Sequence, residues 1–246
     1  MDHGIRLGSV AGIEIRMDWS LLAIFLLILV SLGAGSFPML HPQWSPLLVW
    51  GTAFVASVLF FASVLAHELS HALVGRIYGI TVRRITLFIF GGLAHMEDEP
   101  RQWRGELLMA LAGPVTSLAL GVGFVVLGNL AVGPEAVNPA RPEETLAGLS
   151  PAATMLFWLG PVNIILGVFN LVPGFPLDGG RVLRAVMWGV TGNMRRATRW
   201  ASRAGQGFAW LLIFTGVSLI LGVRLPFLGT GPLNGLWLAF IGWFLN

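Results

Sequence analysis

Residues 19–67 read WSLLAIFLLILVSLGAGSFPMLHPQWSPLLVWGTAFVASVLFFASVLAH and contain no formally charged side chain. Four shorter uncharged runs follow, at 107–134, 145–177, 204–223 and 225–246. A membrane-spanning helix needs about 20 apolar residues, so each short run has room for one span and the 49-residue run has room for two. The sequence therefore predicts an all-α polytopic membrane protein with about six transmembrane helices and a small membrane-associated β-hairpin or sheet.

The amino-acid composition supports a membrane protein and limits which residue types could bind a metal. Charged residues make up 11% of the sequence, whereas a soluble domain carries roughly 25%. The hydrophobic fraction is 55%, which excludes a disordered chain and disfavours an ordinary soluble enzyme. There is no Cys, so any bound metal must be held by His, Asp or Glu.

The pattern along the chain predicts one transmembrane domain, 1–246, with three smaller features. Residues 4–17 alternate in polarity and predict a pair of surface strands. Residues 80–97 are rich in β-branched and aromatic side chains around Gly91-Gly92 and predict a re-entrant β-hairpin. Residues 181–203 predict a basic helical region at the membrane interface. The spans are expected at about 19–35, 46–79, 102–131, 151–172, 204–223 and 233–246, with a polar loop at 133–150.

The first apolar segment could instead belong to a cleaved signal peptide, because small residues follow it at 33–36. Asp2, Glu14 and Asp18 precede the segment, and this favours a retained first span.

The distribution of arginine predicts the orientation. With the N-terminus in the cytosol, 13 of the 15 Arg residues fall on the cytosolic side, and only Arg141 and Arg224 fall outside. We therefore expect a multi-pass protein of the inner or plasma membrane. The arginines are distributed among the predicted cytosolic segments and do not form a single binding surface. The pI near 10.9 therefore does not indicate nucleic-acid binding. The spacing of Arg196, Arg199 and Arg203 suits a helix on anionic lipids of the bilayer.

The segment His67-Glu68-Leu69-Ser70-His71 carries the strongest chemical signal. On a helix, positions i and i+4 share a face, so both imidazoles can reach one metal ion while Glu68 holds a water. Glu68 precedes Arg76 by about 12 Å of helix, which predicts a site inside the bilayer near its cytosolic face. The alternative interpretation is a helix end at which Glu68 sits among the lipid headgroups.

Several residues are candidates for a third ligand. Asp178 follows 33 uncharged residues, and it stands where prolines and glycines break the helix and free the backbone. It could also be a helix cap. His95 in the hairpin is a rival ligand, and Glu106 would serve a metalloprotease class that uses a Glu. His3 and His41 are interpreted as residues without a role in the site.

Four motifs together resemble those of the site-2 protease family of intramembrane zinc metalloproteases, in its compact form without a PDZ insertion. They are His67-Glu68-x-x-His71, the hairpin Gly91-Gly92, Ala112-Gly113-Pro114, and Asn170-x-x-Pro173-x-x-Pro176-Leu177-Asp178-Gly179-Gly180-Arg181. The resemblance covers about residues 5–200.

This resemblance implies one Zn²⁺ per chain held by His67, His71 and Asp178, with Glu68 as the catalytic acid and base. It also implies substrates that are single-span membrane proteins, such as anti-sigma factors or other membrane-tethered regulators. Many members of the family have Asn where Ser117 stands, so the resemblance assigns no role to Ser117.

Two asparagines and the hairpin are candidates for contact with the substrate. Asn163 and Asn170 are seven residues apart and can share a helix face. Asn170 could stabilise an oxyanion, as the family also implies, or both amides could simply join helices. Gly91-Gly92 predicts an open strand edge to which an unwound substrate could add, and the alternative is a plain surface hairpin.

The sequence therefore predicts an intramembrane zinc endopeptidase. The alternative is a membrane metal transporter or sensor that uses the same ligands without hydrolysis. Such a transporter would be expected to have polar residues across the whole bilayer, whereas here they cluster near one face.

Overall fold

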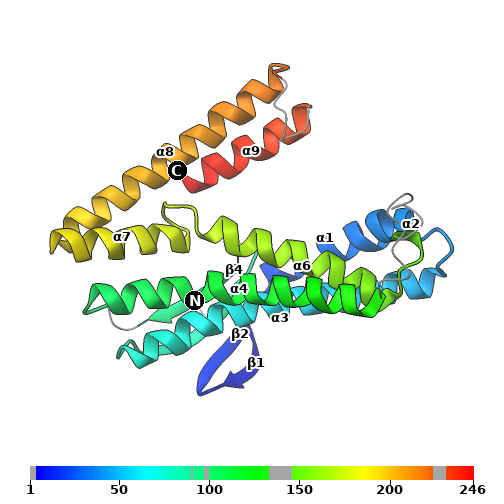
Figure 1. Cartoon of the computed structure of the whole chain (residues 1–246), viewed down its shortest axis with the longest axis horizontal. Helices are drawn as coiled ribbons and strands as arrows, with labels where there is room; N and C mark the ends of the chain where they lie inside the picture. Colours follow the sequence, from blue (N-terminus) through cyan, green and yellow to red (C-terminus); the bar gives the residue numbers. More distant parts are fainter. Residues whose placement is uncertain (1–3, 90, 97–99, 133–145, 224–230) are drawn as a thin grey trace. The chain divides into compact units, whose positions relative to one another are not determined.

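The computed structural model describes residues 4–89, 91–96, 100–132, 146–223 and 231–246. Helices form most of this part of the chain, together with one small sheet (Figure 1). In chain order the elements are β1 Gly4–Val10, β2 Ile13–Asp18, α1 Ser20–Val30, the π-helical η1 Ser31–Ser36, α2 Phe37–Leu40, α3 Pro46–Ile77, β3 Val82–Phe88, β4 Gly91–Met96, α4 Trp103–Val132, α6 Pro151–Asn170, α7 Asp178–Thr191, α8 Met194–Ile220 and α9 Pro232–Leu245.

Five helical segments are long and apolar enough to cross a membrane. They are α3, α4, α6, α8 and the continuous run Ser20–Leu40 formed by α1, η1 and α2. α9 has 14 residues, or about 21 Å of helix, which is short of a bilayer core of about 30 Å. The predicted multi-pass α-helical membrane protein is confirmed, and the estimate of about six spans becomes five spans and one shorter apolar helix among the described residues.

The chain forms two units. The first comprises residues 1–100 and 112–168, and the second comprises 101–111 and 169–246. α4 is one helix whose first turns belong to the second unit and whose remaining turns belong to the first. The two units are described in turn.

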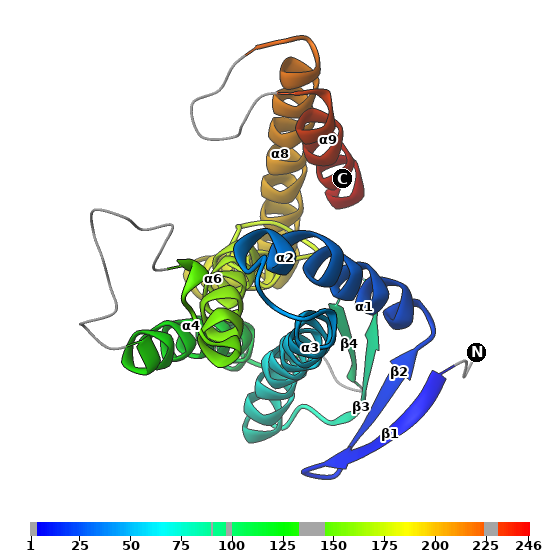
Figure 2. The same ribbon diagram turned by 90° about the vertical axis from the view of Figure 1, so that its right-hand side faces the viewer.

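A four-stranded sheet in the first unit contains both predicted strand pairs, in the order β1-β2-β3-β4 (Figure 2). Each sequence-local pair is antiparallel, and the two hairpins are joined by parallel pairing of β2 with β3, where Ile15 lies opposite Ile85. Ile13, Ile15 and Ile85 are buried on one face. The predicted small sheet is confirmed, but the pairing of β2 with β3 was not predicted, because it joins segments about 70 residues apart.

Charged side chains hold this sheet and attach it to α3. Glu14 pairs with Arg16 at 3.0 Å and also with Arg6 and Arg84. In the last turn of α3, the Arg76 guanidinium donates to the backbone carbonyl of Ala11 and to that of Val82 at 3.2 Å. The sheet therefore lies against the end of α3 that carries the His-Glu motif.

α3, α4 and α6 lie side by side in the first unit (Figure 1). Glycines bring the backbones of α4 and α6 together: a Cβ on Gly121 would lie 2.8 Å from the carbonyl oxygen of Gly160, and one on Gly167 would lie 3.0 Å from that of Pro114. Without a hydrophobic driving force inside lipid, close packing of this kind is a main source of helix association.

The second unit contains α7, α8 and α9. α7 ends at Gly192, whose φ of 64° favours glycine, and α8 begins at Asn193, whose side chain accepts from the backbone N–H of Arg196 at 3.0 Å. The predicted basic region 181–203 is therefore divided between two helices, and α8 continues from its exposed arginines into the apolar span without a break at residue 204. α9 packs on α8 through glycines such as Gly216 and Gly235.

Substituting Gly121→Leu should destabilise the protein, because the new side chain would separate α4 from α6. Overpacking of this kind costs about 1–3 kcal/mol. The matched control is Gly123→Leu, since a Cβ on Gly123 has no atom within 4 Å. Thermal unfolding in detergent should show a lower midpoint for Gly121→Leu than for Gly123→Leu, and equal midpoints would contradict the packing described.

Candidate metal centre

α3 places the two histidines of the motif on one buried face. His67 is 4% exposed and His71 is 6% exposed, and their Nε2 atoms lie 3.2 Å apart. The rings meet edge to face with centroids 4.8 Å apart. The i, i+4 spacing thus aims two imidazole nitrogens at one point, as the sequence predicted.

The space beside these nitrogens exists because residue 113 is glycine. A Cβ on Gly113 would lie 2.5 Å from Nε2 of His67 and closer still to Nε2 of His71. Every other residue would therefore occupy the point at which the two nitrogens converge. Gly113 belongs to the Ala112-Gly113-Pro114 motif of the sequence, and the structure places it beside the two histidines.

Ser117 orients the His67 ring. It lies four residues after Gly113 on α4, is fully buried, and places its Oγ 2.9 Å from Nδ1 of His67. This contact leaves Nε2 directed at His71. A metal-ligating histidine usually has a hydrogen bond of this kind at its other ring nitrogen, which fixes the orientation of the ring. The sequence offered one signal for this residue, its position one helical turn after Gly113.

Glu68 lies directly beside β4. A Cβ on Gly92 would lie 2.9 Å from Oε1 of Glu68 and would overlap its side-chain carbons. Gly91 has a φ of 126°, a backbone conformation that favours glycine. The two predicted hairpin glycines therefore allow the edge strand of the sheet to run against the carboxylate of the motif.

Asp178 belongs to the second unit, where it is the first residue of α7. The two glycines after it allow close backbone packing: a Cβ on Gly180 would lie 2.5 Å from the carbonyl carbon of Gly174, and one on Gly179 would overlap Val172 and its neighbour. Asn170 ends α6, at the other end of the same turn. The Pro-Gly motif thus forms a tight turn that fixes the start of α7.

Other candidates from the sequence lie elsewhere. Asn163 is fully buried, and its amide donates to the carbonyl of Leu159 at 2.9 Å within α6, while its Oδ1 finds no partner among the described residues. His95 is exposed on β4. Glu106, the candidate for a rival protease class, is buried and paired with Arg184.

His41 has a structural role. It is 1% exposed, stacks on Trp44 with ring centroids 3.9 Å apart, and places Nδ1 3.1 Å from the carbonyl of Ala147 and Nε2 2.9 Å from Thr154 Oγ1. His3 lies outside the described residues, as do 133–145 of the predicted polar loop.

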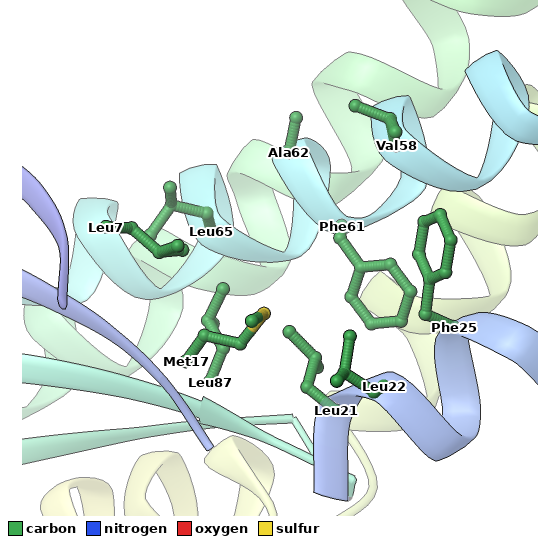
Figure 3. Close-up of a pocket in the computed structure, with 10 residues that line it drawn as sticks. All are labelled: Leu7, Met17, Leu21, Leu22, Phe25, Val58, Phe61, Ala62, Leu65 and Leu87. Atoms are coloured by element: carbon green, nitrogen blue, oxygen red, sulfur yellow. The ribbon is translucent and has the colours of Figure 1, made fainter. Parts of the chain in front are cut away.

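An apolar cavity of about 340 Å³ lies between α1, α3 and the sheet (Figure 3). It is lined by side chains of β1, β2, β3, α1 and α3, among them Met17, Leu21 and Phe61. No polar side chain lines it, so it provides no group for acid–base or metal chemistry.

The histidine pair fits a zinc ion. Zinc favours imidazole nitrogens completed by a carboxylate, with one position left open in catalytic sites. Here the two Nε2 atoms converge, Gly113 places no side chain at the point of convergence, and Ser117 holds one ring in place.

Comparison with known proteins gives the family. The family model described as Peptidase family M50 matches residues 55–141 and 135–212. "Putative zinc metalloprotease sll0528" of Synechocystis sp. is 40% identical over the whole chain, and "Putative zinc metalloprotease Rip3" of Mycobacterium tuberculosis is 39% identical over the whole chain. The chain spans 58% of the first relative's length and 57% of the second's.

A solved structure supports the same family assignment. The Site-2 Protease from Methanocaldococcus jannaschii matches 98% of this chain and 94% of its own, with a TM-score of 0.57 and 27% identity. The chain belongs to Peptidase family M50, and the predicted resemblance to the site-2 proteases is confirmed.

Replacing Ser117 with Ala should weaken zinc binding by about 10–100-fold, because the His67 ring would lose the contact that orients it. The matched control is Ser57→Ala: Ser57 is equally buried, but its hydroxyl donates to the carbonyl of Ala53 within α3. Competition with a chelator measures the affinity. Equal zinc affinity in the two variants would exclude the orienting role of Ser117.

Proposed function

We propose that this chain is an intramembrane zinc endopeptidase, which hydrolyses peptide bonds in or near the membrane-spanning segment of its substrates. The observation that carries this proposal is the buried pair of converging Nε2 atoms of His67 and His71, with Glu68 next to them on α3. Membership of Peptidase family M50 and the zinc metalloprotease relatives support it.

The proposed ligands of a single zinc ion are His67, His71 and Asp178. Together they offer two imidazole nitrogens and one carboxylate oxygen, the donor set that catalytic zinc favours. Asp178 is assigned on the motif around it and on its place after 33 uncharged residues, since an intramembrane carboxylate is functional by default.

Bound zinc would act as a Lewis acid on the attacking water and on the scissile carbonyl. Glu68 accepts a proton from the water as its oxygen adds to the carbonyl carbon, and Asn170 donates a hydrogen bond to the oxyanion. As the C–N bond breaks, Glu68 returns the proton to the leaving nitrogen. The products are a carboxylic acid and an amine, so water is the only co-reactant.

The proposed substrate-binding surface is the edge of the sheet at Gly91 and Gly92, with Asn163 as a further contact. A transmembrane helix hides its carbonyls in i→i−4 hydrogen bonds, so the substrate must unwind before it is cut. An unwound segment that added to β4 as a fifth strand would run beside Glu68, because β4 itself does. The proposed substrates are single-span membrane proteins such as anti-sigma factors or other membrane-tethered regulators.

The proposed location is the inner or plasma membrane, with the N-terminus in the cytosol. The positive-inside distribution of arginine supports this orientation. The motif stands near the arginine-bearing end of α3, which supports a site near the cytosolic face.

The variant Glu68→Gln should lose cleavage by at least about 100-fold while it keeps its zinc, because an amide cannot accept the proton. The assay is hydrolysis of a fluorogenic peptide with one apolar transmembrane segment in liposomes, with zinc measured by elemental analysis. Glu144→Gln, in the predicted polar loop 133–150, is the matched control and should cleave normally.

Two results would contradict this function. Full cleavage by Glu68→Gln would remove Glu68 from the mechanism. Cleavage by the wild type that survives removal of zinc with a chelator would remove the metal. A transporter or sensor would bind zinc without cutting the peptide.

A further inference from the structure

The second unit contains a buried ion pair that the proposed chemistry does not use. Glu106, in the first turn of α4, is fully buried, and the side chain of Arg184 on α7 is 17% exposed. The Arg184 Nε donates to Oε1 of Glu106 at 2.6 Å, and its NH2 contacts the same oxygen. The pair joins the start of α4 to the middle of α7.

Arg184 also reaches the turn that precedes Asp178. Its guanidinium lies over the ring of Phe175, with the carbon atom 5.4 Å from the ring centroid. Phe175 is part of the turn that packs on the first residues of α7, because a Cβ on Gly180 would lie 2.5 Å from the backbone nitrogen of Phe175. One side chain therefore contacts both α4 and the segment that leads to Asp178.

Packing alone does not explain this pair. Removing a carboxylate and a guanidinium from water is costly, and apolar side chains of similar volume often give equal or better stability. The arrangement is also incomplete, since Oε2 of Glu106 finds no hydrogen-bond partner among the described residues. Unlike apolar side chains, the pair fixes a relative orientation. The planar guanidinium of Arg184 sets the position of the Glu106 carboxylate and of the Phe175 ring that stacks on it.

We infer that Glu106 and Arg184 are positioning residues, which hold the start of α7 and the Phe175 turn so that the Asp178 carboxylate has a fixed orientation toward the metal. This inference rests on the proposed function, because it takes Asp178 as a zinc ligand. Neither residue is one of the proposed zinc ligands or catalytic residues. They restrain Asp178 before zinc binds, and this lowers the conformational entropy cost of binding.

The test uses the full chain with the double variant Glu106→Gln/Arg184→Met, which removes both charges and leaves no unpaired ion. Two quantities are measured: zinc affinity by chelator competition, and the unfolding midpoint of the zinc-free protein. We expect a midpoint near that of the wild type and a zinc affinity about 10–100-fold weaker.

Two further variants complete the design. Arg184→Lys keeps the charge but loses the planar fork and the stacking on Phe175, so it should also bind zinc more weakly while folding normally. Arg199→Met, on the exposed surface of α8, is the matched control and should leave both quantities unchanged.

Zinc affinity at the wild-type level in the double variant or in Arg184→Lys would overturn the positioning role and leave the pair as a structural link. Asp178→Ala separates this failure from that of the proposed function. If Asp178→Ala binds zinc as tightly as the wild type, Asp178 is not a ligand and both proposals fail. If it binds weakly and the double variant does not, only the positioning role fails.

Discussion

The site depends on two imidazoles that are buried in an apolar helical bundle and therefore need partners other than water. Each ring has two nitrogens, and a nitrogen without a partner in this environment is costly. For His67 the Nδ1 atom is paired with Ser117, while Nε2 is directed at His71. A metal ion between the two Nε2 atoms would satisfy both rings at once. Glu68 stands beside this point on the same helix, and β4 stands beside Glu68.

Glycine residues allow the backbone of one element to approach functional side chains or the backbone of another element. Gly113 lets α4 pass the histidines, Gly92 lets β4 pass Glu68, and Gly180 lets α7 begin against the preceding turn. In each case a Cβ would overlap the group that the glycine faces. These glycines are thus a steric requirement of close backbone packing, beside the histidines and Glu68 for Gly113 and Gly92, and at the start of α7 for Gly180.

Much of this arrangement could be predicted from the sequence, because the signals are local. The i, i+4 spacing of His67 and His71 on a helix, the two strand pairs and most of the spans follow from short-range periodicity. The parallel pairing of β2 with β3 did not follow, since nothing in either strand specifies a partner about 70 residues away. The extent of α8 was also mispredicted: its charged and apolar halves read as two segments, but the helix continues through Gly205 and Gly207 at their junction.

Contacts between side chains of distant segments were the hardest to predict. The hydrogen bond between Ser117 and His67 depends on how α4 packs against α3, and its only local signal was the position of Ser117 one helical turn after Gly113. Glu106 was considered as a ligand because it is an acidic residue beside an apolar span. Its actual partner is Arg184, on a helix 78 residues further along the chain. The identity of a buried charge's partner is set by tertiary packing, which periodicity does not encode.

X-ray absorption at the zinc edge of the purified protein tests the central claim most directly, because it counts the ligands without reference to activity. The account predicts one zinc per chain, bound by two imidazoles together with oxygen ligands at about 2.0–2.2 Å. The substitution His71→Ala should remove one imidazole from the spectrum. A zinc ion bound by three or more imidazoles, or the absence of stoichiometric zinc, would contradict it.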